Sequence, residues 1–357
     1  MGRILTGASV IALGAHAAYG AGIERSAQSV GVLFEKGNYL EFSLGGVSPD
    51  VSGSVLGGAL SSGDMAVGYS NFSLAYKQAL GDNFDFAAIL DQPVGVGVHY
   101  PASSAPYPFA GATADVDSLA LTALLRYKMP SNISVYGGLK AEEVKGNVSI
   151  PTIGGYKMKA DTSREIGYIV GVAWEKPEIA ARVSLTYNSA ITHTLTAHES
   201  FSPVPTTFET EIPASVNLEF QTGIAKDTLV FGSVRWVDWS KFDITPPAFF
   251  AATGSSLASL ETDYVTYTLG LGRKFNETWS GAVILGYEGP GGLPVGNLGP
   301  TDGYRSIGLA ATYTQGNMKV TGGVRYFEIG DATTKAIGAK FTGNSAVAAG
   351  LRIGYSF

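Results

Sequence analysis

Cysteine is absent from the 357-residue chain, and charged residues are few. Without cysteine, neither a disulfide framework nor a thiolate metal site can form. Charged residues make up 15% of the chain, whereas an average protein has about 25%. The formal net charge is −6, so a basic patch that neutralises phosphates is not expected. We therefore predict that nucleic acid is not a partner.

Long apolar runs are also scarce. No stretch of about 18 apolar residues follows residue 20, so the sequence predicts no membrane-spanning helix. Residues 1–20 have one positive charge at Arg3, a short apolar stretch and small residues before Ala21, which is the layout of a secretory signal peptide cleaved after Ala17 or Gly20. The alternative for this segment is a buried N-terminal helix. If the remaining chain enters a membrane, it does so as strands.

Glycine and aromatic residues are abundant instead, with 47 Gly, 18 Tyr and 17 Phe. Apolar and polar residues alternate at period two in fourteen segments between residues 38 and 357, which is typical of strands with two differently solvated faces. The third segment covers 84–98, the seventh 179–192 and the eighth 208–224. Short turns alternate with long loops along the chain, and the long loops include 151–162 and 245–262.

An even number of antiparallel strands with short turns at one end and long loops at the other is the layout of an outer-membrane barrel. No linker divides the chain into two domains. We therefore predict an all-β fold, a 14-stranded antiparallel transmembrane β-barrel over residues 37–357. Its predicted location is the outer membrane of a Gram-negative bacterium.

The two faces of the predicted strands differ in charge. In the eighth segment, Val216 and Leu218 alternate with Asn217 and Glu219. An Arg or Lys that faces lipid at the midplane costs about 2 to 4 kcal/mol, so the charged face should line the lumen. The lumen would then contain Arg126, Arg182, Arg235, Arg325 and Arg352. Such a basic cluster can hold a carboxylate head group. Alternatively, these arginines pair with Asp and Glu across the lumen and fill it.

Aromatic residues near the strand ends predict interfacial girdles. They are Tyr127, Trp174, Trp236, Trp239, Trp279, Tyr287, Tyr313 and Phe357.

The sequence gives little support for an enzyme, because it has no G-x-S-x-G, P-loop or H-E-x-x-H motif. His193 and His198 fall in or beside predicted loops, and their spacing puts the two imidazoles on opposite faces of a strand. We predict no catalytic site, no metal site and no cofactor.

The third segment breaks its own pattern at proline and glycine. Pro93 cannot donate a hydrogen bond to a strand ladder, so within a sheet it is expected at an edge or a bulge. A closed barrel has no edge. We therefore predict a kink and a gap in the barrel wall, bordered by Asp91, Gln92, Pro93 and Gly95.

Three stretches carry a resemblance to a known family. They are the kinked "ILDQPVGVGVHYP" at 89–101, the run "PASVNLEFQTGIAKDTLVFGSVRWVDWSKF" at 213–242 and the terminal "GYSF". Together they resemble the FadL-type outer-membrane transporters of long-chain fatty acids and other hydrophobic compounds. The resemblance implies a plug, or hatch, inside the barrel, capture of ligand at extracellular loops and lateral exit at the kinked third strand. It also implies a monomer that needs neither a cofactor nor an energy source.

The hatch is short in this chain, covers residues 21–36 and lacks the Asn-Pro-Ala motif of the family. Leu33 and Phe34 are the candidates for a plug contact, with packing against the first strand as the alternative. The loop that contains Phe249 and Phe250 offers apolar surface for initial capture.

The predicted function is passive uptake of hydrophobic small molecules such as fatty acids. The alternative is a general or substrate-selective aqueous porin, although fourteen strands are fewer than the 16 to 18 of barrels with an aqueous channel. Outer-membrane lipid is an expected partner. The barrel assembly machinery is another, since the terminal Phe357 with apolar residues at alternate positions before it resembles the signal that this machinery reads.

Overall fold

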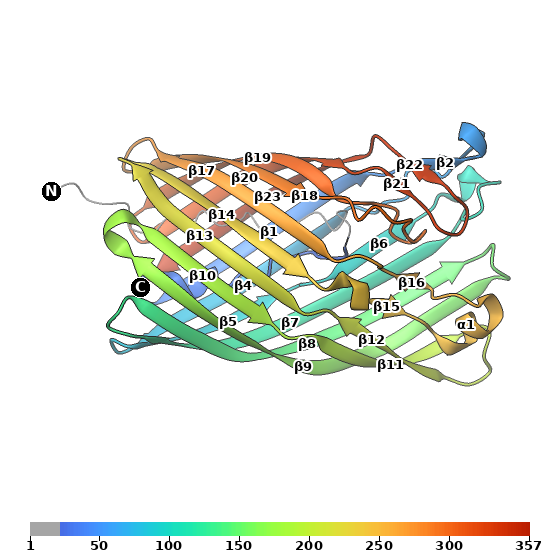
Figure 1. The fold of residues 1–357 in the computed structure, drawn as a ribbon, viewed down its shortest axis with the longest axis horizontal. Coiled ribbons are helices and arrows are strands. Elements are labelled where there is room, and N and C mark those ends of the chain that lie inside the picture. The colour runs from blue at the N-terminus through green and yellow to red at the C-terminus, as the bar shows by residue number, and fades with distance from the viewer. Residues whose placement is uncertain (1–21) are drawn as a thin grey trace.

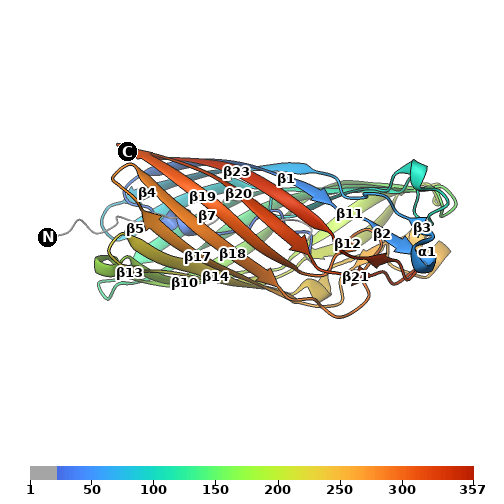
Figure 2. The same cartoon turned by 90° about the horizontal axis from the view of Figure 1, so that it is seen from above.

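The computed structural model describes residues 22–357, which form one closed barrel of tilted strands (Figures 1 and 2). The predicted signal peptide lies outside the described residues. The C-terminus lies at the end of the barrel where the short turns are, opposite the long loops (Figure 1). Short turns are periplasmic in outer-membrane barrels, so the long loops mark the extracellular end.

The barrel has fourteen antiparallel strands when a broken strand is counted once, as predicted. In order around the wall they are β1 (Tyr39–Asp50), β4 (Tyr69–Leu80), β5 (Phe84–Asp91) with β6 (Gly95–His99), β7 (Thr113–Lys128), β8 (Ile133–Ile150), β9 (Tyr156–Lys176), β10 (Ala181–Asn188) with β11 (Ile191–Glu199), β12 (Thr206–Ile212) with β13 (Ser215–Ala225), β14 (Thr228–Val237), β17 (Tyr264–Lys274), β18 (Trp279–Glu288), β19 (Tyr304–Gln315), β20 (Met318–Ile329) and β23 (Ser345–Ser356). The last strand closes the barrel by pairing with β1 over their whole lengths.

Short elements occupy the turns, the loops and the lumen. They are η1 (Gly31–Phe34), β2 (Gly53–Val55), η2 (Leu56–Gly58), β3 (Leu60–Ser61), η3 (Ala102–Ser104), η4 (Pro177–Ile179), η5 (Trp239–Lys241), β15 (Asp243–Ile244), α1 (Pro247–Thr253), β16 (Ala258–Ser259), β21 (Ala332–Thr333) and β22 (Lys340–Phe341). Among residues 22–357, no helix is long and apolar enough to cross a membrane.

Three barrel strands are interrupted. The third breaks between Asp91 and Gly95, the seventh between Asn188 and Ile191, and the eighth at Pro213. The first break was predicted from Pro93. The other two were not, because a two-residue interruption leaves the alternation of the flanking segments intact.

Two predicted boundaries are wrong. Residues 156–162 were predicted as a loop but form the start of β9, and the seventh strand continues beyond residue 192 to Glu199. His193 and His198 consequently lie on β11 itself, where His193 is buried and His198 is exposed. These stretches extend beyond the apolar belt, so their outward side chains are charged or polar and the sequence there looks like a loop.

The wall has an apolar outer belt. Along β9 the exposed side chains are Ile166, Tyr168, Val170, Val172 and Trp174, a span that matches the 9 to 11 residues of a tilted transmembrane strand. Toward the loops the same face continues with charged residues, Arg164, Lys159 and Lys157.

The last strand follows the predicted alternation. Leu351, Ile353, Tyr355 and Phe357 are exposed, whereas Gly354 is buried and Arg352 is only partly exposed. One residue of the predicted girdle does not fit: Trp239 is only 2% exposed, because η5 turns it inward against Phe242.

Candidate functional site

The N-terminal segment, residues 22–38, lies inside the barrel. Its 3₁₀ turn η1 includes Leu33, which is completely buried. Polar contacts with the wall hold the chain before η1: Ser29 Oγ donates to Glu219 (2.7 Å), and Asn217 Nδ2 donates to the carbonyl of Ala27 (3.0 Å). Hydrogen-bonding side chains on the inner face of β13 thus position a segment that has little regular structure of its own.

Phe34 anchors the periplasmic end of this segment. The guanidinium carbons of Arg126 and Arg182 each lie 4.5 Å from the centroid of its ring. Tyr136 contacts the same ring edge-on at 5.9 Å between centroids. Arg126 also donates to the carbonyl of Leu33 (3.1 Å). Phe34 therefore contacts Arg126 and Arg182 through its ring, and Leu33 contacts Arg126 through its carbonyl oxygen.

The five predicted arginines do not form one cluster. Arg126 pairs with Asp85 and Glu175, Arg235 with Glu24, and Arg352 with Glu41. Arg325 lies over the ring of Phe327 and donates to Ser306 (3.0 Å). These residues belong to β19 and β20, which lie across the barrel from the strands that contact Phe34. Binding of a carboxylate head group by these arginines stays a prediction.

The break in the third strand is occupied by the N-terminal segment. The carbonyl of Pro93 turns inward and accepts hydrogen bonds from the N–H groups of Arg25 (2.9 Å) and Ser26 (3.3 Å). The N–H of Gly95 in turn donates to the carbonyl of Ile23 (2.8 Å). Residues 23–26 thus satisfy two backbone groups of the kink, and Ser118 Oγ on β7 accepts a hydrogen bond from the N–H of Val94 (2.9 Å) and donates one to its carbonyl (2.6 Å).

The four residues predicted to border the gap all take part in this junction. Asp91 accepts a hydrogen bond from Ser26 Oγ (2.6 Å), and Gln92 Oε1 accepts one from the N–H of Phe72 on β4 (3.1 Å). Backbone pairing of β4 with β5 runs from Leu80 to Leu74. Backbone hydrogen bonding to the third strand resumes just before β4, where the N–H of Val67 donates to the carbonyl of Gly97 on β6 (3.2 Å).

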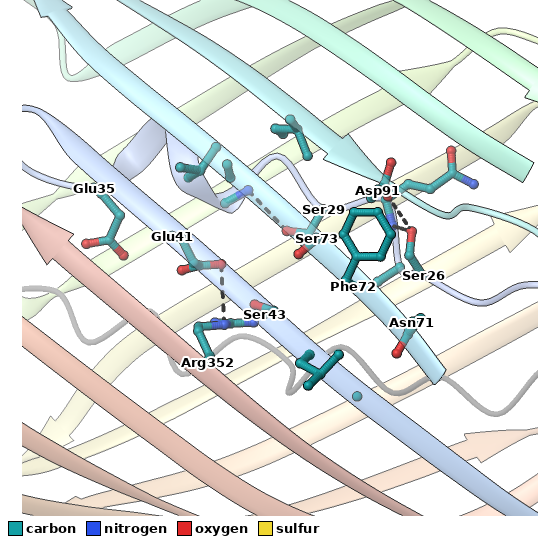
Figure 3. A pocket seen from close by; sticks show the side chains of 18 residues that line it. Ser26, Ser29, Glu35, Glu41, Ser43, Asn71, Phe72, Ser73, Asp91 and Arg352 are labelled. Carbon is teal, nitrogen blue, oxygen red and sulfur yellow. Dashed lines mark hydrogen bonds and ion pairs between the residues drawn. The ribbon is translucent and has the colours of Figure 1, made fainter. Parts of the chain in front are cut away.

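A polar cavity of about 110 Å³ lies between the N-terminal segment and the wall made by β1, β4 and β5 (Figure 3). Carboxylates of Glu35, Glu41 and Asp91 line it, together with the guanidinium of Arg352, whose Nε lies 3.3 Å from Glu41. An apolar molecule in this cavity would desolvate these three carboxylates and the guanidinium, so the cavity is a poor site for it.

A second cavity, of about 70 Å³, is apolar and lies toward the loops. Ile23 of the N-terminal segment and Val96 of β6 border it, and Phe208, Phe242, Ile244 and Leu257 are among its other lining residues. Because Ile23 and Val96 belong to the kink junction as well, this cavity lies directly beside the break in the third strand.

Comparison with known proteins identifies the family. Residues 2–287 match the family described as outer membrane protein transport protein (OMPP1/FadL/TodX). The chain belongs to this family. FadL/TodX proteins are transporters of hydrophobic compounds in the outer membrane of Gram-negative bacteria, and this location and general role hold for the chain. No curated protein sequence matches it.

Solved structures of FadL/TodX proteins share the fold at low sequence identity. A FadL homologue of Pseudomonas aeruginosa is 14% identical over 91% of both chains, with a TM-score of 0.76. The toluene transporter TodX of Pseudomonas putida is 13% identical over 90% of both chains, with a TM-score of 0.63. The toluene transporter TbuX of Ralstonia pickettii is 14% identical over 91% of this chain and 90% of its own, with a TM-score of 0.60.

The extracellular loop of this FadL/TodX protein contains the two phenylalanines that were predicted to capture ligand. Phe250 is 49% exposed, whereas Phe249 is buried against Tyr156, with 4.8 Å between the ring centroids. Glu199 accepts hydrogen bonds from the N–H groups of Ala248 (3.1 Å) and Phe249 (2.8 Å), and so caps the start of α1. Burial alone would raise the pKa of Glu199, but these bonds and those from Thr206 and Tyr156 lower it below its usual range.

No group of His, Cys, Asp and Glu suited to a metal ion occurs among residues 22–357. Sequence analysis missed Glu24 and Arg25, which make ion pairs between the N-terminal segment and the wall. The available signal was the adjacent charged pair Glu24 and Arg25, in a segment that has a second such pair at Glu35 and Lys36. Their partners on β7 and β14 lie far away in sequence, so the signal could not be interpreted without the fold.

Proposed function

We propose that this FadL/TodX protein takes up hydrophobic small molecules passively, by capture at the extracellular loops, passage through the apolar cavity and lateral exit at the broken third strand. Long-chain fatty acids are the proposed ligands. The short N-terminal segment acts as the hatch between the cavity and the exit, and the protein works as a monomer without a cofactor.

The observation that carries this proposal is the shared boundary of the apolar cavity and the break. Ile23 and Val96 line the cavity and belong to the junction where the N-terminal segment replaces a wall strand. A ligand in the cavity therefore needs to displace only residues 23–26 to reach the gap between β4 and β6. The route avoids the polar cavity, where an apolar chain would desolvate carboxylates at high cost.

The cavity must widen before it holds a ligand. Its volume of about 70 Å³ is smaller than the roughly 150 Å³ of an apolar cavity that accepts benzene. Leu257 and Phe242 line it from the loop side, and Ile23 lines it from the hatch side. Movement of either side enlarges it, which fits a pathway that opens when ligand arrives from the exposed Phe250 above.

The test is uptake of radiolabelled oleate by a strain that lacks the native protein and carries either the wild type or a straightened variant, Pro93→Val with Gly97→Val, which leaves Gly95 and so the space for Arg25 unchanged. We expect the variant to reach the cell surface and to lose uptake. Gly322→Ala serves as the control, because a Cβ there meets nothing closer than 4.0 Å. Equal uptake by the straightened variant and the wild type overturns the lateral exit. Large, steady ion conductance in planar bilayers supports the aqueous porin instead.

A further inference from the structure

One side chain of the N-terminal segment reaches across the broken strand to the outer surface of the barrel. Arg25 starts inside the lumen, and its Nη1 bonds to Asp117 on β7 at 3.1 Å. Asp117 belongs to the outward-facing set of β7, next to the apolar outer belt that begins at Leu119. The Arg25 guanidinium carbon also lies 4.7 Å from the ring centroid of Tyr69 on β4. A single guanidinium therefore contacts the strands on both sides of the third strand.

The third strand leaves room for this side chain by having glycine at position 95. A methyl group added to Gly95 would lie 2.5 Å from the guanidinium carbon of Arg25, which is shorter than any real contact. Gly95 has no positive φ, so the backbone conformation does not require glycine there. The requirement is space: the guanidinium takes the place of a wall side chain.

The backbone of Arg25 is held as firmly as its side chain. Its N–H donates to the carbonyl of Pro93 (2.9 Å), and its carbonyl accepts a hydrogen bond from Asn71 Nδ2 on β4 (2.8 Å). Arg25 is thus bonded to β4, to the kink and to β7, the three elements that frame the gap.

The ion pair has one buried end and one exposed end. The side chain of Arg25 is 7% exposed and that of Asp117 is 50% exposed. A fully buried pair is costly to break because an uncompensated charge stays in the protein. Here water can solvate Asp117 once the pair opens, so only the charge of Arg25 loses its compensation.

We propose that Arg25 is the gating residue of the lateral exit. Its ion pair with Asp117 closes the gap in the wall, and ligand leaves only when this pair breaks. The inference rests on the proposed function for its transport consequence. Its structural part, that the pair holds residues 23–26 in the break, is independent of transport.

The test uses two single variants and a charge swap in the full-length protein. Arg25→Met keeps the apolar stem and removes the charge, and Asp117→Asn changes only the outward partner. Each is expected to raise initial oleate uptake per molecule at the surface by about two- to fivefold, the effect expected from losing a half-exposed ion pair. The swap Arg25→Glu with Asp117→Arg is expected to return uptake toward the wild-type rate. Arg164→Met is the control, because it removes an exposed ion pair with Glu143 away from the break.

A second measurement tests the gating role of Arg25 separately from the proposed transport route. Hydrogen exchange of purified protein in nanodiscs follows the amides of 23–26 and 94–97, which we expect to exchange faster in both single variants and at the wild-type rate in the swap. If the straightened variant loses uptake while Arg25→Met and Asp117→Asn behave like the wild type in both assays, the gating role of Arg25 is refuted and the lateral exit stands. If the wild type takes up no oleate, the proposed function fails, and only the exchange data test whether the ion pair holds residues 23–26 in the break. Faster exchange in the two single variants supports this, and unchanged exchange refutes it.

Discussion

Replacing Phe34 removes a ring that two guanidinium groups face. Phe34→Leu keeps most of the apolar area but loses the π faces toward Arg126 and Arg182, each 4.5 Å from the ring centroid. One cation–π contact contributes about 0.5 to 2 kcal/mol, depending on how dry it is, so two give about 1 to 3 kcal/mol at this half-buried position. Since each 1.4 kcal/mol is a factor of ten, the undocked population of the N-terminal segment should rise about 5- to 150-fold.

Hydrogen exchange measures this undocking directly. The amides of Leu33 and Glu35 are bonded within the segment, to the carbonyls of Val30 (3.0 Å) and Val32 (3.1 Å), and exchange when η1 leaves the wall. Phe34→Leu should speed their exchange by the factor above, and Phe34→Ala by more, because it also loses buried apolar area.

Phe250→Leu is the matched control for this prediction, since it makes the same substitution at an exposed loop position. Exchange at 30–35 in the Phe250 variant should equal that of the wild type. Wild-type exchange in Phe34→Leu refutes the reasoning, because it means that the guanidinium contacts with the ring do not hold the segment.

Three further predictions concern the loop, the wall and the terminus. Because the pKa of Glu199 is lowered, its stabilisation of α1 is complete above the unfolded-state pKa of about 4.3 and is lost as pH falls through the lower folded-state value. Protection of the amides of 248–254, measured against the intrinsic exchange rate at each pH, should fall only in that acid range, whereas in Glu199→Gln it should be low at every pH; a wild-type profile in that variant contradicts this. Gly138→Ala should abolish the folded, heat-modifiable form on gels, because a methyl group there would lie 1.8 Å from the carbonyl oxygen of Ala123, while Gly322→Ala should fold; a folded Gly138→Ala band counts against the close approach of β7 and β8. Deleting Phe357 should lower surface yield far more than oleate uptake per assembled molecule, and a normal yield removes the proposed role of this residue in assembly.

Much of the wall could be predicted from the sequence because lipid imposes a strict rule on it. A strand that faces hydrocarbon must alternate, so Leu351 to Phe357 reveal both the strand and its outward face. The break at Pro93 was equally readable, since the missing N–H is a property of the residue itself. Beyond the belt this rule no longer applies, and the start of β9 at Tyr156 was consequently taken for a loop.

The candidate site was harder to predict because its contacts join residues far apart in the chain. Alternation along the strands was enough to select five arginines, but not their partners: Phe34 for Arg182, Glu24 for Arg235 and Glu41 for Arg352. Trp239 was placed in a girdle because tryptophan near a strand end usually lies there. Only the turn η5 directs it inward.

The amino-acid sequence is enough to predict a barrel, the strand faces that meet lipid and the position of the break in the wall. These are local properties, set by alternation at period two and by the chemistry of proline. What fills the break is visible only once the chain is folded. Arg25 and Asp117 are 92 positions apart and meet because barrel closure brings the lumen segment against β7, while Gly95 leaves the space between them. Such a contact depends on the packing of three chain segments, and no pattern within any one of them specifies it.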